Sequence, residues 1–293
     1  MADEKKFLAD IQSDDANVRF DAWRRAGEES ATAIAQLGKL AASTNPGVAK
    51  AALEAITTMT HAVGKDPASA KRPAVVKGLL EIAGAGYALP VRVHALRMLS
   101  GIAGEESVPA IAAQIASAEL REEVIYCLEQ IPGRAPIQAM LTAYNNVRDE
   151  FKPRILAALG HRRAAEAVEL CAEAMRSPNK EVALAAMKAF ARIGLKPAAE
   201  PRFPDTAQLS DWEKTEHTDS LLRYADSQAG SPEALRIYRT ALERPEEHVQ
   251  CAAVIGLAKI GTPEAAAAIV PKLKSTNRTV RLTAQQAWKA IAG

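Results

Sequence analysis

The chain has few aromatic residues and almost no excess of charge of either sign. Phenylalanine, tryptophan and tyrosine make up 4% of the 293 residues, and 37 Lys and Arg side chains are balanced by 35 Asp and Glu, for a net charge of +2. This balance excludes the strongly basic composition of a dedicated nucleic-acid coat protein. Few aromatic residues together with 61 alanines disfavour a β-sandwich or barrel and predict closely packed helices.

Sequence signals for a disulfide framework, an export signal and a membrane span are also missing. The three cysteines lie far apart and form no CxxC pair, which favours a reducing cytosol over a disulfide scaffold. Four of the first six residues are charged, and no apolar signal-peptide segment follows them. No run of about 18 apolar residues occurs. We therefore expect a cytoplasmic protein that does not enter a membrane.

The usual motifs of catalytic and metal sites are absent as well. None of the five histidines lies in an HExxH motif or precedes a glutamate, and no GxSxG elbow or Gly-rich phosphate loop occurs. Cys127 and Cys171 fall in apolar helical segments and are expected to be buried, whereas Cys251 and His217 are expected to be exposed. The sequence therefore favours a protein that is not an enzyme and uses no metal or cofactor.

The dominant feature is an apolar pattern that recurs with a typical spacing of about 31 residues. In residues 91–102 the apolar positions fall at 0, +4, +5, +8 and +11, which is one face of a helix. Position zero of this frame is occupied by Val18, Val48, Val91, Leu120, Phe151, Val182, Val249 and Val280. The spacing accommodates two short helices and two turns. One gap of 67 residues predicts a further, degenerate unit, and hence about nine helical pairs.

Residues typical of helix ends flank the repeated helices. Candidate N-caps are Asp15 or Asn17, Asn45, Asn179 and Asn277. Candidate C-caps are Gly104, Gly160, Gly194 and Gly261. The sequence thus predicts one array over residues 1–293.

Two stretches near 61–90 and 195–212 interrupt the period. Three prolines in the second stretch forbid a regular helix, so we expect it to replace the first helix of the degenerate unit. A helix over 210–226, capped by Ser210, should follow. The favoured interpretation is a surface loop held by its own Phe203 and Trp212, and the alternative is a binding loop.

The helix and linker motifs resemble those of the HEAT family. Residues 277–281, Asn-Arg-Thr-Val-Arg, are similar to the family's D/N-x-x-V-R helix start, and residues 260–265, Ile-Gly-Thr-Pro-Glu-Ala, resemble its I-G-x-P-E-A link. The resemblance is to the short HEAT-like repeats also called PBS-lyase-type repeats. It implies an all-α, right-handed α-solenoid, or α-α superhelix, in which the second helix of each pair lines a concave surface. The V-R arginine is present at Arg19, Arg92, Arg121 and Arg281 and absent from the other units.

Position +6 of the frame falls on this inner surface if the resemblance holds. Three of its eight residues are basic and one is acidic, and further cations lie one turn along. The predicted partner-binding residues are Arg24, Arg97, Tyr126, Lys188, Arg192 and Lys259. We expect a monomeric, non-catalytic scaffold that binds an acidic or mixed segment of another protein.

Three alternatives stay open, and one of them is that the chain forms half of a heterodimer or homodimer through an exposed apolar end repeat. The repeat subclass implies an accessory phycobilin-lyase-type protein or chaperone, which predicts an enclosed apolar pocket at a repeat junction. A nucleic-acid-binding HEAT-like protein would use the basic C-terminal stretch, although the balanced charge disfavours it.

Overall fold

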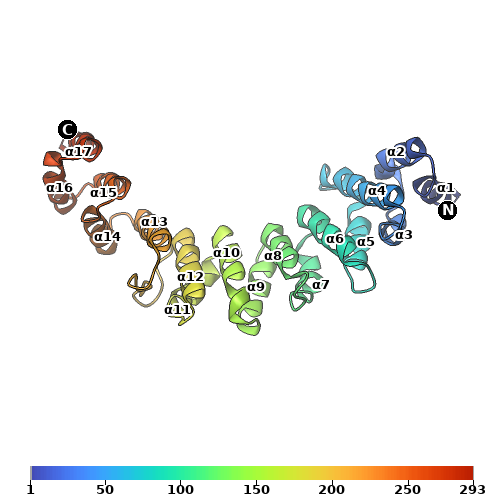
Figure 1. The fold of residues 1–293 in the computed structure, drawn as a ribbon, viewed down its shortest axis with the longest axis horizontal. Coiled ribbons are helices and arrows are strands. Elements are labelled where there is room, and N and C mark those ends of the chain that lie inside the picture. Colours follow the sequence, from blue (N-terminus) through green and yellow to red (C-terminus); the bar gives the residue numbers. More distant parts are fainter. Residues whose placement is uncertain (1, 293) are drawn as a thin grey trace. The chain divides into compact units, whose positions relative to one another are not determined.

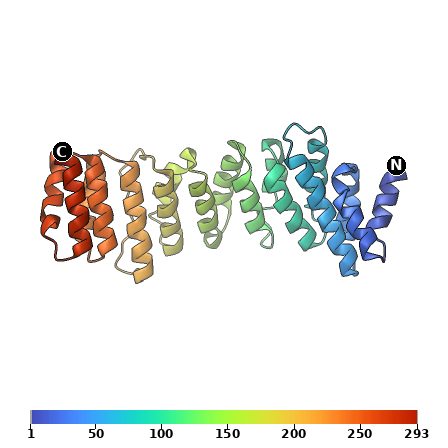
Figure 2. The ribbon, with the colours of Figure 1, turned by 90° about the horizontal axis from the view of Figure 1, so that it is seen from above.

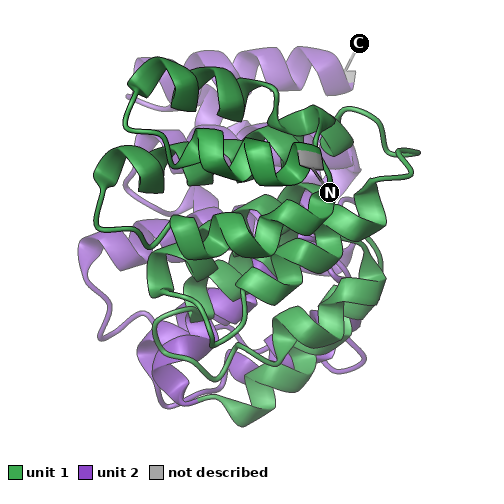
Figure 3. Cartoon of the chain, turned by 90° about the vertical axis from the view of Figure 1, so that its right-hand side faces the viewer, with its two compact units in different colours: residues 1–147 green, residues 148–293 purple. Residues whose placement is uncertain are grey.

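The computed structural model describes residues 2–292, and all regular elements within them are helical. The chain divides into two compact units, Met1–Val147 and Arg148–Gly293, which Figure 3 colours separately. Short 3-10 helices accompany the α-helices at η1 (Ala26–Glu28), η2 (Ala31–Ala33), η3 (Glu105–Ser107), η4 (Asp149–Phe151), η5 (Ala165–Ala167) and η6 (Val270–Lys274). The all-helical architecture predicted from the sequence is confirmed.

Unit 1 contains two layers of helices. Its α-helices are α1 (Ala2–Ile11), α2 (Ala16–Arg24), α3 (Ile34–Leu40), α4 (Pro46–Gly64), α5 (Arg72–Ile82), α6 (Leu89–Ile102), α7 (Val108–Ala112), α8 (Arg121–Gln130) and α9 (Ala135–Asn146). Helices α2, α4, α6 and α8 form one layer, and each contacts the next (Figure 1). Helices α3, α5, α7 and α9 form the other layer.

Unit 2 repeats this arrangement with one helix missing. Its α-helices are α10 (Lys152–His161), α11 (Val168–Ala174), α12 (Lys180–Ile193), α13 (Asp211–Ser227), α14 (Pro232–Leu242), α15 (Glu247–Ile260), α16 (Pro263–Ile269) and α17 (Arg278–Ala292). Helices α10, α12, α13, α15 and α17 form the layer that continues the repeated frame, and Figure 2 shows α13, α15 and α17 as neighbouring rods. No α-helix precedes α13 within residues 194–210, as the prolines predict.

The apolar columns of the sequence form the core of both units. All eight residues at position +4 are buried: Ala22, Ala52, Ala95, Val124, Ile155, Ala186, Ala253 and Ala284. Small residues at or near position +7 allow close helix contacts. A Cβ on Gly160 would lie 2.7 Å from the Ala189 Cα, and one on Gly256 would lie 2.2 Å from the Tyr238 ring. Six of the eight anchors are buried as well, whereas Val18 has 37% of its surface exposed and Phe151 is half-buried.

Four helices of the repeated frame begin with the same turn. The predicted caps Asp15, Asn45, Asn179 and Asn277 all accept backbone N–H bonds from the first helical turn. Each cap residue also donates its own N–H to a serine hydroxyl two residues earlier, at 3.2 Å: Ser13, Ser43, Ser177 and Ser275. This Ser-x-Asp/Asn turn satisfies donors that a helix start would otherwise leave unpaired.

In two of these four turns the V-R arginine donates back to the turn. The Arg19 guanidinium donates to the Ser13 carbonyl at 2.6 Å, and Arg281 donates to the Ser275 carbonyl at 2.6 Å. Gln250 occupies the arginine position of α15 and donates across the same separation, to the Arg244 carbonyl at 2.6 Å. The column therefore stabilises the turn before the helix, and glutamine can replace arginine in it.

Two of the four predicted glycine C-caps are confirmed and two are wrong. Gly194 and Gly261 end α12 and α15 in the left-handed conformation, with φ of 70° and 67°. Gly104 instead has extended backbone before η3. Gly160 lies inside α10 against Ala189, and the left-handed residue after that helix is Arg163, with φ of 49°.

The two predicted interruptions differ in extent. Near 61–90, α4 runs on to Gly64 and α5 is regular, so only 65–71 and 83–88 are irregular. In unit 2 the irregular segment spans 195–210 and ends at Ser210, whose hydroxyl forms a capping box with Glu213 as predicted. Phe203 holds this segment against Phe190 and Tyr224, with ring centroids 6.3 and 5.8 Å apart.

Candidate functional site

The six predicted partner-binding residues divide equally between the two units. Arg24 ends α2, Arg97 lies on α6 and Tyr126 on α8, all in unit 1. Lys188 and Arg192 lie on α12 and Lys259 on α15, all in unit 2. None of the six side chains is buried. Position +6 of the frame is therefore turned away from the core in both units.

In unit 1, Arg97 and Tyr126 belong to one cluster on α6 and α8. The Arg97 guanidinium Nε donates to Glu123 Oε2 at 3.1 Å, and its Nη2 pairs with the other carboxylate oxygen. Tyr126 lies one turn beyond Glu123 on α8 and is 44% exposed. We call Arg97, Glu123 and Tyr126 the α8 cluster.

A pocket of about 420 Å³ adjoins the α8 cluster on the side of α4. Arg97 lines it together with His61, Lys65, Met98 and Ile102. A pocket of this size, with an apolar wall and cations beside it, can receive a partner's side chain. No pattern in the sequence indicates this pocket, because its lining comes from two helices, α4 and α6, that are separated in the chain.

Arg24 lies apart from this cluster, on α2. Its guanidinium carbon is 5.3 Å from the centroid of the Phe20 ring, and Phe20 packs edge-on against Trp23 at 5.2 Å. Phe20 is 45% exposed, so the arginine covers part of an apolar surface.

In unit 2, Lys188 forms a similar cluster with α13. Its ammonium group pairs with Glu216 and lies 5.0 Å from the centroid of the Trp212 ring. Trp212 is 67% exposed, the largest fraction among the exposed large hydrophobic side chains described. We call Lys188, Trp212 and Glu216 the α13 cluster. Arg192 is exposed one turn further along α12.

Lys259 is held by an acid on a neighbouring helix. Its ammonium group lies 3.0 Å from Asp226 Oδ1, which also accepts a hydrogen bond from the Tyr238 hydroxyl at 3.0 Å. The Lys259 cation thus links α15 to α13 and α14.

Three of the predicted cations therefore have carboxylate partners, and two of these, Arg97 and Lys188, are among the three cations at position +6. Glu123, Glu216 and Asp226 supply these carboxylates. Sequence columns did not reveal them, because each acid lies on a different helix and at a different position from its cation. Each of the two clusters has an exposed aromatic ring, and neither has an excess of positive charge.

Two of the three cysteines are buried. Burial raises the pKa of Cys127 and Cys171 to about 12, so both stay protonated at neutral pH. Cys251 is half-buried rather than exposed, with its sulfur 3.6 Å from the Thr283 hydroxyl. Within residues 2–292 no three His, Cys, Asp or Glu side chains are grouped to hold a metal ion.

His217 corrects the expectation of an exposed histidine. It is buried to 7% exposure beneath the 195–210 segment, and its Nε2 lies 3.0 Å from the Pro204 carbonyl. Burial lowers its pKa from the usual 6.5, the Pro204 hydrogen bond raises it, and the Arg244 charge lowers it further. The sequence could not show that the segment covers this side chain.

Among the described helices, none is long and apolar enough to cross a membrane.

Comparison with known proteins places the chain among helical repeats. Residues 220–289 match the sequence profile of HEAT repeats, whereas no curated protein matches the chain. A chain in the structure of Kap95p binding RanGDP is 14% identical, with a TM-score of 0.52, over 99% of this chain and 44% of that chain. This chain thus spans less than half the length of that neighbour.

Two further structures are similar over most of their length. An engineered protein is 20% identical over 100% of this chain and 89% of its own, with a TM-score of 0.48. Human deoxyhypusine hydroxylase in complex with glycerol is 19% identical over 81% of this chain and 97% of its own, with a TM-score of 0.35. The repeated helical pairs, the matched segment and the fold shared with the Kap95p structure show that this chain is a HEAT-like repeat protein.

Proposed function

We propose that the chain is a non-catalytic scaffold that binds another protein through the helix layer carrying the α8 and α13 clusters. The observation that carries this proposal is the exposed aromatic ring beside an ion pair in each cluster. Tyr126 lies by Arg97–Glu123, and Trp212 lies by Lys188–Glu216. Tyrosine, tryptophan and arginine are the residues most enriched at the energetic centres of protein interfaces.

The clusters favour a partner segment of mixed character. Each cluster offers a cation, a carboxylate and an aromatic face, so a purely acidic segment would meet repulsion from Glu123 or Glu216. A segment with an apolar side chain flanked by both charges suits them better. The similar Kap95p structure, in which Kap95p binds RanGDP, supports the idea that this fold can present a protein-binding surface.

The proposal includes the organisation predicted from the sequence. We propose that residues 1–293 form a single right-handed array of about nine pairs, with the layer of α2, α4, α6 and α8 on its concave side. We also propose that the chain acts as a cytoplasmic monomer. Small-angle scattering of the full chain, together with its mass by light scattering, tests the single monomeric array.

Binding is tested with a matched pair of double variants. The tagged chain captures partners from native lysate, and the identified partner is then titrated in purified form. Tyr126→Ala/Trp212→Ala should weaken binding by about tenfold or more, because it removes both aromatic faces. Leu195→Ala/Val270→Ala is the control, since it truncates two apolar side chains of 45% and 43% exposure outside the clusters.

The outcomes separate the alternatives. Equal binding by both double variants, with unchanged helical circular dichroism, contradicts a site at these clusters. Captured material that absorbs at 260 nm and is released by salt supports nucleic-acid binding instead. A bound chromophore with visible absorbance supports the accessory lyase alternative. A third variant, Arg24→Glu/Arg97→Glu/Lys188→Glu, tests whether the cations contribute beyond the aromatic rings.

A further inference from the structure

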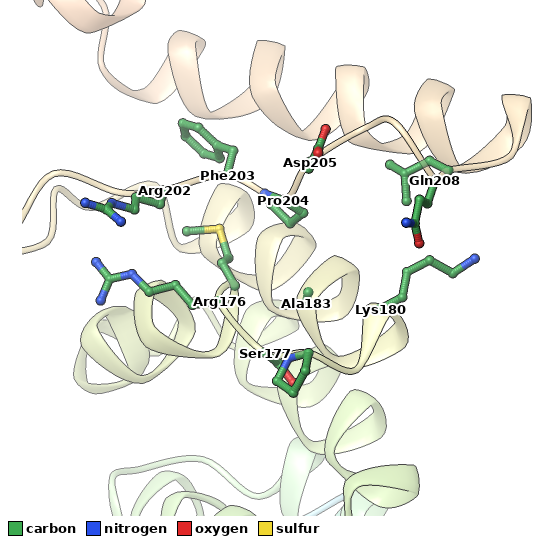
Figure 4. Close-up of a pocket in the computed structure, with 12 residues that line it drawn as sticks. Arg176, Ser177, Lys180, Ala183, Arg202, Phe203, Pro204, Asp205 and Gln208 are labelled. Atoms are coloured by element: carbon green, nitrogen blue, oxygen red, sulfur yellow. The ribbon is translucent and has the colours of Figure 1, made fainter.

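A separate pocket of about 450 Å³ lies in unit 2, beneath the 195–210 segment. One side is the turn that joins α11 to α12, with Met175 and Arg176, and the other side is the segment itself (Figure 4). Its volume lies in the range of pockets that hold small ligands or peptide side chains. The proposed scaffold function makes no use of this pocket.

The walls of the pocket are fixed by the protein's own contacts. Phe203, which lines it, is held in the aromatic cluster with Phe190 and Tyr224. Leu209 is 6% exposed, and the Ala198 N–H donates to Glu169 of α11 at 2.7 Å. A pocket held in this way costs little ordering free energy when a ligand enters.

The charge around the pocket is unbalanced. Three cations line it, Arg176, Lys180 and Arg202, against the single carboxylate of Asp205. Lys180 is already paired with Glu213 at 2.8 Å. Within the described part of the chain, the structure shows no ion pair or hydrogen bond for the Arg176 or Arg202 guanidinium groups. They thus differ from Arg97, Lys188 and Lys259, which all have carboxylate partners.

The two arginines also lie together. Figure 4 shows their guanidinium groups at the same end of the pocket, whereas Lys180 and Gln208 lie at the other end. Arg176 comes from the turn after α11 and Arg202 from the irregular segment. Two neighbouring guanidinium groups repel each other unless an anion lies between them, and each can bind a carboxylate through two parallel hydrogen bonds.

We propose that this pocket binds a short acidic segment of a protein partner. A Glu or Asp carboxylate lies between Arg176 and Arg202, and a neighbouring apolar side chain packs on Phe203 and Leu209. A bare anion would leave this apolar wall uncovered, so the mixed lining favours a peptide. The inference rests on the proposed scaffold function but concerns a surface that shares no residue with the α8 and α13 clusters.

A random octapeptide library displayed on phage and selected on the purified full chain tests the proposal. The selection removes peptides that also bind Arg176→Gln/Arg202→Gln. We expect the remaining peptides to be enriched in Glu or Asp next to Leu, Ile or Phe. The best peptide is then labelled with fluorescein, and its affinity is measured by anisotropy.

Matched variants define the expected change in affinity. Arg176→Gln/Arg202→Gln should weaken binding of that peptide by about tenfold or more, and so should replacing the peptide's Glu by Gln. Arg223→Gln/Arg278→Gln removes the same charge from positions of unit 2 outside the pocket lining, so its affinity should stay close to that of the wild type. Tyr126→Ala/Trp212→Ala should also leave peptide affinity unchanged.

Three results would overturn the proposal. The first is a selection that yields no peptide able to distinguish the wild type from Arg176→Gln/Arg202→Gln. The second is a set of selected peptides that lack acidic residues. The third is displacement of the peptide by inorganic phosphate at an equal concentration. Failure of the proposed function is seen separately, as an unchanged affinity of the lysate partner for Tyr126→Ala/Trp212→Ala.

Discussion

The two units interrupt the same repeat in different ways. In unit 1 the extra residues lengthen α4 and form short turns on either side of α5, so both helices of the pair are kept. In unit 2 the 195–210 segment takes the place of a helix. One aromatic residue anchors each interruption: Tyr87 packs over Gly38 in unit 1, and Phe203 packs between Phe190 and Tyr224 in unit 2.

The surroundings of the two interruptions also differ. In unit 1 the added turn supplies hydrogen bonds to a neighbouring segment. The Lys71 ammonium group donates to three backbone carbonyls, of which the Glu28 carbonyl is the nearest at 2.9 Å. In unit 2 the segment that replaces a helix leaves a pocket with Arg176 and Arg202 beneath it. The pocket in unit 1 adjoins the end of the lengthened α4, so concave surface lies beside both interruptions, but only the unit 2 pocket has two arginines side by side.

The largest effect is expected from Phe203→Ala, which removes the anchor in unit 2. Losing a partly buried ring from a three-ring cluster should lower the free energy of unfolding of this unit by about 3 kcal/mol. Hydrogen exchange read by mass spectrometry should rise in α12 and α13 and stay unchanged in unit 1. Phe203→Leu keeps most of the volume and should cost about 1 kcal/mol. Equal exchange in both units would contradict the role of this ring.

Gly38→Ala tests the corresponding anchor in unit 1. The added Cβ would lie 2.7 Å from the buried Ile82 Cγ2 and 3.0 Å from the Tyr87 ring, so we expect a loss of about 2 kcal/mol in denaturant unfolding. Gly101→Ala is the control, because its Cβ meets nothing within 4 Å and alanine favours the helix. A loss at both positions would show that packing around Gly38 is not the cause.

The pH dependence of the stability of unit 2 should reflect His217, which lies buried beneath its segment, although burial also lowers the pKa of His94 in unit 1. The pKa of His217 in the folded chain lies below the usual 6.5, so the unfolded chain takes up a proton first as the pH falls. We therefore expect unit 2 to lose stability below about pH 6.5, with less loss in His217→Gln. Hydrogen exchange in α13 at several pH values checks this. An identical pH profile for the variant would contradict it.

The smallest effect is expected from Tyr87→Phe. The hydroxyl makes only long hydrogen bonds, at 3.4 Å to the Ala35 carbonyl and 3.3 Å to Glu81, so its loss should cost about 0.5 kcal/mol. Thermal unfolding followed by circular dichroism can resolve this difference. A cost near that of Phe203→Ala would mean that the hydroxyl, rather than the ring, anchors the unit 1 turn.

Much of the fold could be predicted because the same packing of a helix between two neighbouring helices recurs along each unit. A helix that packs on both neighbours needs small or apolar residues at fixed positions, so Ala22, Ala95 and Ala253 mark the core without any structure. The prediction of Gly160 as a C-cap was wrong because a glycine near a helix end can serve either to end the helix in a turn or to allow close packing. Only the contact with Ala189 shows that close packing, rather than a turn, requires it.

The candidate sites were less predictable, because their contacts join different helices. The position of Arg97 on the surface follows from the frame, but its partner Glu123 does not. The pocket beneath the 195–210 segment could not be predicted from the sequence either. An irregular segment has no period, and its path depends on where Phe203 finds other rings.

The Ser-x-Asp/Asn turns have a consequence for how the chain acquires its fold. Their hydrogen bonds, including those of Arg19 and Arg281, join residues only two to six positions apart. Such contacts have low contact order and close without a large loss of chain entropy. Each turn can therefore form before any distant part of the chain is present. Folding can thus begin at several turns and spread to neighbouring pairs, even while the chain is still being synthesised.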